Sequence, residues 1–244
     1  MDGNLIETFH LQPGQVFEGS LLIRNSGDQA EPGHAFITDY LFGASGWNRY
    51  DPPGSHPRSS GHWIQVSPSE FVVPAGGEVF LAYSIQVPVD TTLQGSYWCA
   101  VIIEPGTAIS TDMASDSEGE NPDVALRTVI RHSIQFSMDV GAGGLKEVQI
   151  VGRALEPGEQ GLNLILDVEN SGESWVNPLI WAEFFNSEGE RVDRQEQQRG
   201  RLYPTCSLRQ IFPLNLVTGS YEVLVIIDDG NGEAWGAQYS LEIP

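Results

Sequence analysis

Apolar and polar residues alternate with a period of two in several parts of this chain, and the alternation is longest over residues 124–138. Its apolar positions and one threonine share a parity: Val124, Leu126, Thr128, Ile130, Ile134, Phe136 and Met138. Because successive side chains of a β-strand point to opposite faces, this period predicts a strand with one apolar face. Fifteen residues is long for a strand, so this segment exceeds what its own domain needs and can offer an edge to another chain.

Shorter β-like segments, bounded by glycine, proline, asparagine and serine, fill most of the remaining sequence. No amphipathic helical stretch is longer than two turns, and the 27 glycines and 15 prolines suit an all-β chain with many turns. We expect strands near residues 5–10, 16–24, 34–42, 63–66, 79–87 and 95–104 and, after residue 144, near residues 145–155, 162–169, 179–186, 206–213, 219–228 and 236–243.

The two halves of the chain repeat each other. The turn Asn25-Ser-Gly-Asp recurs as Asn170-Ser-Gly-Glu, and Gly95-Ser-Tyr recurs as Gly219-Ser-Tyr at the same place in the strand order. Two tandem immunoglobulin-like β-sandwiches are the simplest account of this repetition.

A glycine-rich joint at residues 141–144 predicts the boundary between the sandwiches. The first domain would cover residues 1–140, and long loops at 43–62 and 105–123 would make it the larger. The second domain would cover residues 145–244.

A formal charge of −21, with Lys146 as the only lysine, leaves no basic face that could neutralise phosphates. Nucleic acid and anionic membrane surfaces are therefore poor partners. No segment is apolar enough to be inserted in a bilayer, and Met1-Asp-Gly-Asn does not begin a signal peptide. We expect a protein outside the cytoplasm, periplasmic or on the cell surface, whose signal peptide has been removed.

The two cysteines, Cys99 and Cys206, fall in different halves, so no disulfide framework is expected. Cys99 follows Tyr97 by two residues, which is the spacing of the tyrosine corner in immunoglobulin-like sandwiches. Its apolar surroundings predict a buried thiol rather than a nucleophile.

Several of these features resemble the periplasmic pilus chaperones, which have a PapD-like fold of two immunoglobulin-like domains. They are the tandem domains, the Asn25-Ser-Gly turn, and the run Val-Ala-Leu-Arg-Thr-Val-Ile-Arg at residues 124–131. In that family the last strand of the first domain lends alternating apolar residues to an incomplete pilin, and a basic residue anchors the terminal carboxylate of the subunit. The resemblance implies partner-binding roles for Val124, Leu126, Thr128 and Arg131. The first strand lacks the arginine that the family uses as the second half of the anchor.

The chain also resembles the two-domain surface proteins of Gram-positive bacteria that associate with WxL proteins. That similarity lies in Leu11-Gln-Pro-Gly-Gln, in the Asn25-Ser-Gly turn and in residues 214–221 of the second half. It implies binding to a cell wall or to another surface component.

Enzyme motifs are missing from the sequence: there is no Gly-x-Ser-x-Gly, no phosphate loop and no His-Glu-x-x-His. We therefore expect a non-enzymatic protein without a cofactor. His56 and His62 lie in a Gly/Pro loop that we interpret as solvated rather than as a metal site. The aromatic residues of the same region, Trp47, Tyr50 and Trp63, suggest a sugar-stacking surface as a further hypothesis, although cores and loop packing use the same residue types.

The densest acidic cluster is a weak calcium candidate, because hard cations prefer carboxylate oxygens. It comprises Asp112, Asp116, Glu118, Glu120 and Asp123. Its glycine is misplaced for a calcium loop, and a mobile acidic loop is the preferred interpretation. The sequence Asp-Asp-Gly-Asn-Gly at residues 228–232 is first of all a hairpin turn.

These observations favour a binding protein that captures a partner protein, pilin-like or a surface subunit, by pairing strands at residues 124–131. The alternative is an adhesion module that binds cell-wall glycan or peptidoglycan.

The repeat predicts that the second half folds by itself. Residues 145–244, expressed alone, should show a β-type circular dichroism spectrum and a cooperative unfolding transition. A fragment without a transition would contradict the two-domain interpretation.

Overall fold

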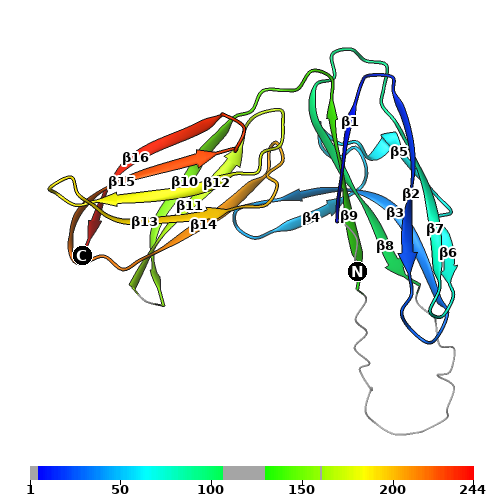
Figure 1. Cartoon of the computed structure of the whole chain (residues 1–244), viewed down its shortest axis with the longest axis horizontal. Helices are drawn as coiled ribbons and strands as arrows, with labels where there is room; N and C mark the ends of the chain where they lie inside the picture. Colours follow the sequence, from blue (N-terminus) through cyan, green and yellow to red (C-terminus); the bar gives the residue numbers. More distant parts are fainter. Residues whose placement is uncertain (1–4, 107–129, 160) are drawn as a thin grey trace, which may run out of the picture. The chain divides into compact units, whose positions relative to one another are not determined.

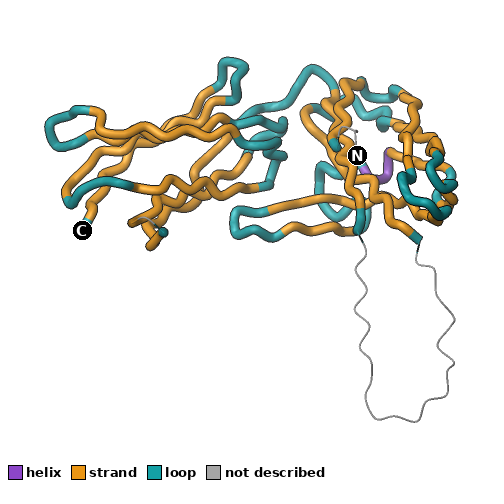
Figure 2. The backbone as a smooth tube through the Cα atoms, turned by 60° about the horizontal axis from the view of Figure 1, so that its bottom comes forward, coloured by secondary structure: helices purple, strands orange, loops and turns teal. Residues whose placement is uncertain are grey.

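The computed structural model describes residues 5–106, 130–159 and 161–244. Within these ranges the structure is β almost throughout, and the one helical element is the 3₁₀ turn η1, Gly61–Trp63 (Figure 2). The described residues contain no helix with the length and apolarity needed to cross a membrane.

Contacts divide the chain into two compact units. The N-terminal unit consists of Met1–Asp39, Asp51–Asp90 and Trp98–Met138. The C-terminal unit consists of Tyr40–Tyr50, Thr91–Tyr97 and Asp139–Pro244. The second unit thus takes up two short segments from the first half of the sequence.

The described residues of the first half of the chain form nine strands (Figure 1). They are β1 Ile6–Leu11, β2 Val16–Arg24, β3 Glu31–Phe42, β4 Asn48–Asp51, β5 Ile64–Ser67, β6 Glu70–Val73, β7 Glu78–Gln86, β8 Gly95–Pro105 and β9 His132–Val140. One sheet has the order β1-β9-β8-β3-β4, with β6 also beside β3, and the other has the order β2-β7-β5. This is the strand order of an immunoglobulin-like sandwich, as the sequence predicts.

The core of the N-terminal unit follows from the apolar pattern. Leu81 and Ile85 of β7 are fully buried. Burial alternates along the strand, so that every second residue lies closer to solvent. β8 differs, because its residues from Trp98 to Ile103 are all buried. A strand covered on both faces needs a continuous apolar run, and β8 has one.

The second half of the chain contributes seven strands in two sheets. They are β10 Val148–Gly158, β11 Gly161–Asn170, β12 Leu179–Phe185, β13 Arg191–Gln198, β14 Ser207–Leu214, β15 Gly219–Asp228 and β16 Ala234–Ile243. The sheets have the orders β10-β11-β14 and β13-β12-β15-β16, again an immunoglobulin-like arrangement. The hydroxyl of Tyr221 donates to the carbonyl of Val217 at 2.9 Å, which is the bond of a tyrosine corner.

The structure adds three strands that the sequence did not predict, β4, β6 and β13, and of these β6 pairs with β3. Residues 48–51, expected to be part of a loop, form β4, which makes a hairpin with β3 closed by the bond from Gly43 N–H to the Trp47 carbonyl. β13 is polar on both faces and therefore lacks apolar alternation. It is held by backbone pairing with β12 and by cross-strand ion pairs such as Arg191–Glu183 at 2.8 Å.

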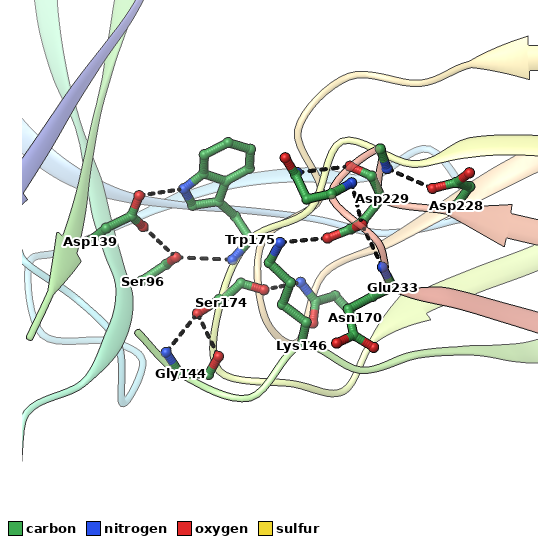
Figure 3. Close-up of polar contacts among 12 residues, drawn as sticks. Ser96, Asp139, Gly144, Lys146, Asn170, Ser174, Trp175, Asp228, Asp229 and Glu233 are labelled. Carbon is green, nitrogen blue, oxygen red and sulfur yellow. Dashed lines mark hydrogen bonds and ion pairs between the residues drawn. The ribbon is translucent and has the colours of Figure 1, made fainter. Parts of the chain in front are cut away.

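Hydrogen bonds in the C-terminal unit surround the predicted joint (Figure 3). The carboxylate of Asp139 accepts bonds from the hydroxyl of Ser96 at 2.8 Å and from the indole N–H of Trp175 at 3.1 Å. The same hydroxyl accepts the backbone N–H of Trp175 at 2.9 Å, and the N–H of Gly144 donates to the hydroxyl of Ser174 at 3.0 Å. The last residue of the joint is therefore fastened to the loop after β11.

Lys146 follows this joint and forms an ion pair with the buried side chain of Asp229. Burial raises the pKa of Asp229, but the bonds from Lys146 and from the N–H groups of Asn231 and Glu233 outweigh it, and the net pKa is lowered. The residues that the sequence indicated as a hairpin turn therefore form that turn, with the carboxylate of Asp229 at its centre.

Both cysteines are buried and unbonded to each other. Burial raises the pKa of Cys99 to about 12 and that of Cys206 to about 11, so neither is a thiolate at neutral pH.

A thiol reagent should consequently find no reactive group in the native protein and two after unfolding in denaturant without reductant. A rapid native reaction would contradict the burial, and a count of zero after unfolding would reveal a disulfide.

Candidate functional site

Ile130 and Arg131, which immediately precede β9, are the part of the predicted partner-binding segment, residues 124–131, that the structure describes. β1 and β9 are neighbours and run in the same direction (Figure 1). The N–H of Gln135 donates to the carbonyl of Leu5 at 2.8 Å, so β1 accompanies β9 from about Gln135 onward. The edge of β9 is therefore covered along most of the strand. Among the described residues, no strand covers this edge before Gln135.

The apolar face of this segment passes from the core into solvent as the chain is followed back toward its N-terminus. Phe136 and Met138 are fully buried, Ile134 is half-buried, and Ile130 is 65% exposed. All four share the parity that the sequence assigned to one apolar face. An apolar side chain that leaves its own sandwich in this way is available to another surface.

Arg131 lies at the same place and binds a carboxylate of its own chain. Its guanidinium meets Glu104 of β8 with Nε–Oε2 at 2.9 Å and Nη2–Oε1 at 3.5 Å. The arginine side chain is 62% exposed and the glutamate 23%, so water screens the pair and its contribution to stability is about 0–1 kcal/mol. The guanidinium can therefore exchange this carboxylate for another at little cost.

The other residues predicted from sequence lie outside the described ranges. These are the partner-binding candidates Val124, Leu126 and Thr128 and the calcium candidates Asp112, Asp116, Glu118, Glu120 and Asp123. Within the described ranges no group of three or more histidine, cysteine or acidic residues is placed to hold a metal ion.

A loop takes the place of β3 beside β8. β3 pairs with β8 from Gly33 to Thr38 and then bends away. Beyond that point the N–H of Trp98 donates to the carbonyl of Arg58 at 3.1 Å, and the N–H of Ser60 donates to the carbonyl of Trp98 at 3.2 Å. The loop thus satisfies buried backbone groups that would otherwise lack partners.

The buried carboxylate of Asp39, where β3 bends, holds this loop. It accepts the N–H of Ser55 at 2.7 Å and the hydroxyl of Ser59. His56 lies between them with its ring 4.4 Å from that of Trp98, and its Nε2 is 3.9 Å from Asp39. The interpretation of His56 as a solvated loop residue was wrong, because the loop folds onto β8 and buries the imidazole. His62 is exposed.

Burial lowers the pKa of His56, although the nearby carboxylates of Asp39 and Asp51 oppose the shift. The imidazole is therefore neutral in the folded protein near neutral pH.

The aromatic residues proposed for sugar stacking lie in two different elements. Trp47 and Tyr50 are exposed on the β3–β4 hairpin of the C-terminal unit, and Arg49 lies 5.9 Å from the Trp47 ring. The Tyr50 ring packs 5.1 Å from that of Tyr40. Trp63 is half-buried in η1 of the N-terminal unit.

Sequence reasoning missed Glu104 as the partner of Arg131. The signal was present, because Glu104 ends the apolar run of one strand and Arg131 precedes the next, and the two strands are neighbours in an immunoglobulin-like sheet. It also missed the network of Asp39, since nothing in the local sequence around Asp39 indicates which loop will reach it.

No protein-family model and no curated protein matches the sequence. Among solved structures, the chain is similar to one in a chaperone–tip adhesin complex of CFA/I fimbriae, with 11% identity, 97% of this chain and 96% of that chain covered, and a TM-score of 0.48. The class 5 fimbriae chaperone CfaA is 12% identical, the match covers 97% of this chain and 96% of that chain, and the TM-score is 0.46. A chain of the CsuC–CsuE pre-assembly complex of Acinetobacter baumannii is 10% identical, the match covers 94% of each chain, and the TM-score is 0.47. Fimbrial chaperones are thus among the structures that this chain resembles over its whole length.

The lowered pKa of His56 predicts a pH-dependent stability. Below about pH 6.5 the unfolded chain binds a proton at this histidine that the folded chain does not, so stability should fall as the pH decreases from 7 to 5, by at most about 1.4 kcal/mol per pH unit. Denaturant unfolding at several pH values should show a shallower slope for His56→Phe.

His62→Gln is the control, because it removes an exposed histidine from the neighbouring turn η1. Equal slopes for wild type and His56→Phe would show that His56 does not titrate as its burial implies.

Proposed function

We propose that the protein is a non-enzymatic, chaperone-like binding protein that captures another protein by strand pairing at the N-terminal end of β9. The observation that carries the proposal is the course of one apolar face, from fully buried Phe136 to Ile130, which is 65% exposed. The preceding positions of the same parity, Val124, Leu126 and Thr128, would continue this face into the partner. An edge that pairs with an extended segment gains affinity from backbone bonds and specificity from alternate side chains.

Arg131 would anchor the partner through a carboxylate. It already holds that of Glu104 in an exposed pair, so a terminal carboxylate of the partner can replace an existing ligand of the same chemistry. β1 runs from Ile6 to Leu11 without an arginine, so within this strand no second guanidinium is available. Among the residues that the structure describes in β1 and β9 and just before β9, the anchor would therefore depend on Arg131 alone.

The partner would be a subunit of pilin or surface-protein kind, and the protein would act in the periplasm or at the cell surface. The charge of −21 disfavours nucleic acid and anionic membranes as alternatives. We also propose that the boundary between the two domains lies near residues 141–144.

Binding to cell-wall glycan is the second candidate, supported by the exposed rings of Trp47 and Tyr50 on one hairpin. Co-sedimentation with insoluble peptidoglycan tests it, and Trp47→Ala should abolish that sedimentation if the hairpin is the site.

Replacing Leu126 by Asp tests the apolar face. If Leu126 contacts the partner, the melting temperature should change little, while capture of the partner from the native host should weaken about thirtyfold, the equivalent of about 2 kcal/mol. A variant that loses its fold would instead identify Leu126 as an ordinary core residue, since it would bury an unpaired carboxylate.

Arg131→Glu and Glu104→Gln separate the anchor from the ion pair. Both variants break the pair and should alter the melting temperature only slightly. Arg131→Glu should abolish capture because it repels a carboxylate, whereas Glu104→Gln should preserve or strengthen capture because it frees the guanidinium. Equal losses of capture in both variants would contradict the anchor role.

A further inference from the structure

The C-terminal sandwich has an opening between its edge strands β10 and β16. Within the described sheets β10 pairs only with β11, and β16 pairs only with β15. A cavity of about 280 Å³ lies between these four strands. Its apolar lining comes from Leu155, Leu164, Val223 and Leu241, of which Leu155 is 39% exposed at the mouth.

A β-bulge in β10 directs the side chain of Arg153 toward this opening. The pairing of β10 with β11 slips between Ile150 and Gly152, so Val151 is an extra residue. Before the bulge Ile150 stands opposite Val168, and after it Arg153 stands opposite Leu166, which is also a core position. Even-numbered residues of β10 such as Ile150 therefore face the core before the bulge, and odd-numbered residues face it afterwards. As a result, Arg153 faces the cavity.

The guanidinium of Arg153 is held in place but keeps its donors. It lies over the ring of Tyr239, with Cζ 4.5 Å from the ring centroid. A stacked guanidinium uses its faces, while its five N–H donors lie in the plane and are still able to bind an anion. Tyr239 and Arg153 together line the cavity, so these donors are at its polar end.

Glu156 and Glu242 neighbour cavity residues in the sequence, but their carboxylates do not line the cavity. Glu156 follows Leu155 on the outward parity and lies close enough to Arg209 to raise the pKa of that arginine. Glu242 follows Leu241 on the outer face of β16, where it accepts the hydroxyl of Ser220 at 2.9 Å. The printed contact of the Arg153 guanidinium is therefore with an aromatic ring, and Ser240, which also lines the cavity, donates its hydroxyl to Glu222 at 2.8 Å.

We propose that this cavity binds a small organic carboxylate with an apolar chain, such as a medium-chain fatty acid. The carboxylate would bind to Arg153, and the chain would lie against exposed Leu155, with the buried side chains of Leu164, Val223 and Leu241 beneath it. A volume of 280 Å³ corresponds to roughly nine water-sized units at about 30 Å³ each, which is close to the ten non-hydrogen atoms of octanoate. This site is independent of the strand-pairing function at β9.

Calorimetric titration of the full chain with octanoate is the test, with octanamide as the uncharged ligand of the same length. Octanoate should bind at least about tenfold more tightly, because a charge-assisted bond to a guanidinium is replaced by a neutral one. Hexanoate should bind more weakly than octanoate by up to about fourfold for each methylene removed.

Arg153→Gln should abolish the preference for octanoate over octanamide. Arg191→Gln is the matched control, because it removes the same charge from β13 in the same unit, where the arginine pairs with Glu183. Leu155→Gln should reduce the dependence on chain length while leaving the preference for the carboxylate. Melting temperatures of the three variants confirm that each is folded.

Equal binding of octanoate and octanamide, or equal losses in Arg153→Gln and Arg191→Gln, would overturn the proposal. So would a short peptide with a free C-terminal leucine that binds more tightly than octanoate and loses its binding in Arg153→Gln, because the occupant would then be a protein terminus.

Discussion

The N-terminal unit depends on the pairing of buried backbone groups along β8. This strand is covered on both faces, so its N–H and carbonyl groups have no access to water and each needs a partner. β3 supplies partners as far as Thr38, and the loop at Arg58–Ser60 supplies them at Trp98. Asp39 ties the bend in β3 to that loop, and His56 fills the space over Trp98. One constraint thus explains a buried acid, a buried histidine and an ordered loop.

The same constraint identifies the places where the chain can bind something else. β9 is paired with β1 from Gln135 onward, and its apolar parity leaves the core before that point. β10 and β16 border an apolar cavity, and the bulge at Val151 directs Arg153 into it. In each case an exposed apolar surface occurs next to an arginine that can bind a carboxylate. In a chain of charge −21 such arginines are few, and the proposed carboxylate recognition at both places rests on them.

Much of the fold followed from local pattern. The alternation of apolar residues located most strands, and the repeated Asn-Ser-Gly and Gly-Ser-Tyr turns indicated two sandwiches. Their first strands differ, because β1 pairs with β9 whereas β10 pairs with β11. The glycine of the first Gly-Ser-Tyr has a physical reason: Gly95 has a φ of 80°, and a Cβ there would lie 2.4 Å from the carbonyl oxygen of Glu173. Of the candidate site, the sequence proposed Arg131 but did not indicate Glu104, the carboxylate that it binds in the structure.

The sequence by itself determined most of the segments that become strands and which face of each is apolar, because these properties depend mainly on neighbouring residues. Tertiary structure decided the rest. β13 exists because β12 offers backbone partners to a polar segment, and His56 is buried because β3 bends away from β8. Arg153 faces inward because one residue is inserted at the bulge, which reverses the parity that the sequence alone would assign. Such outcomes require partners distant in sequence, and no local pattern records them.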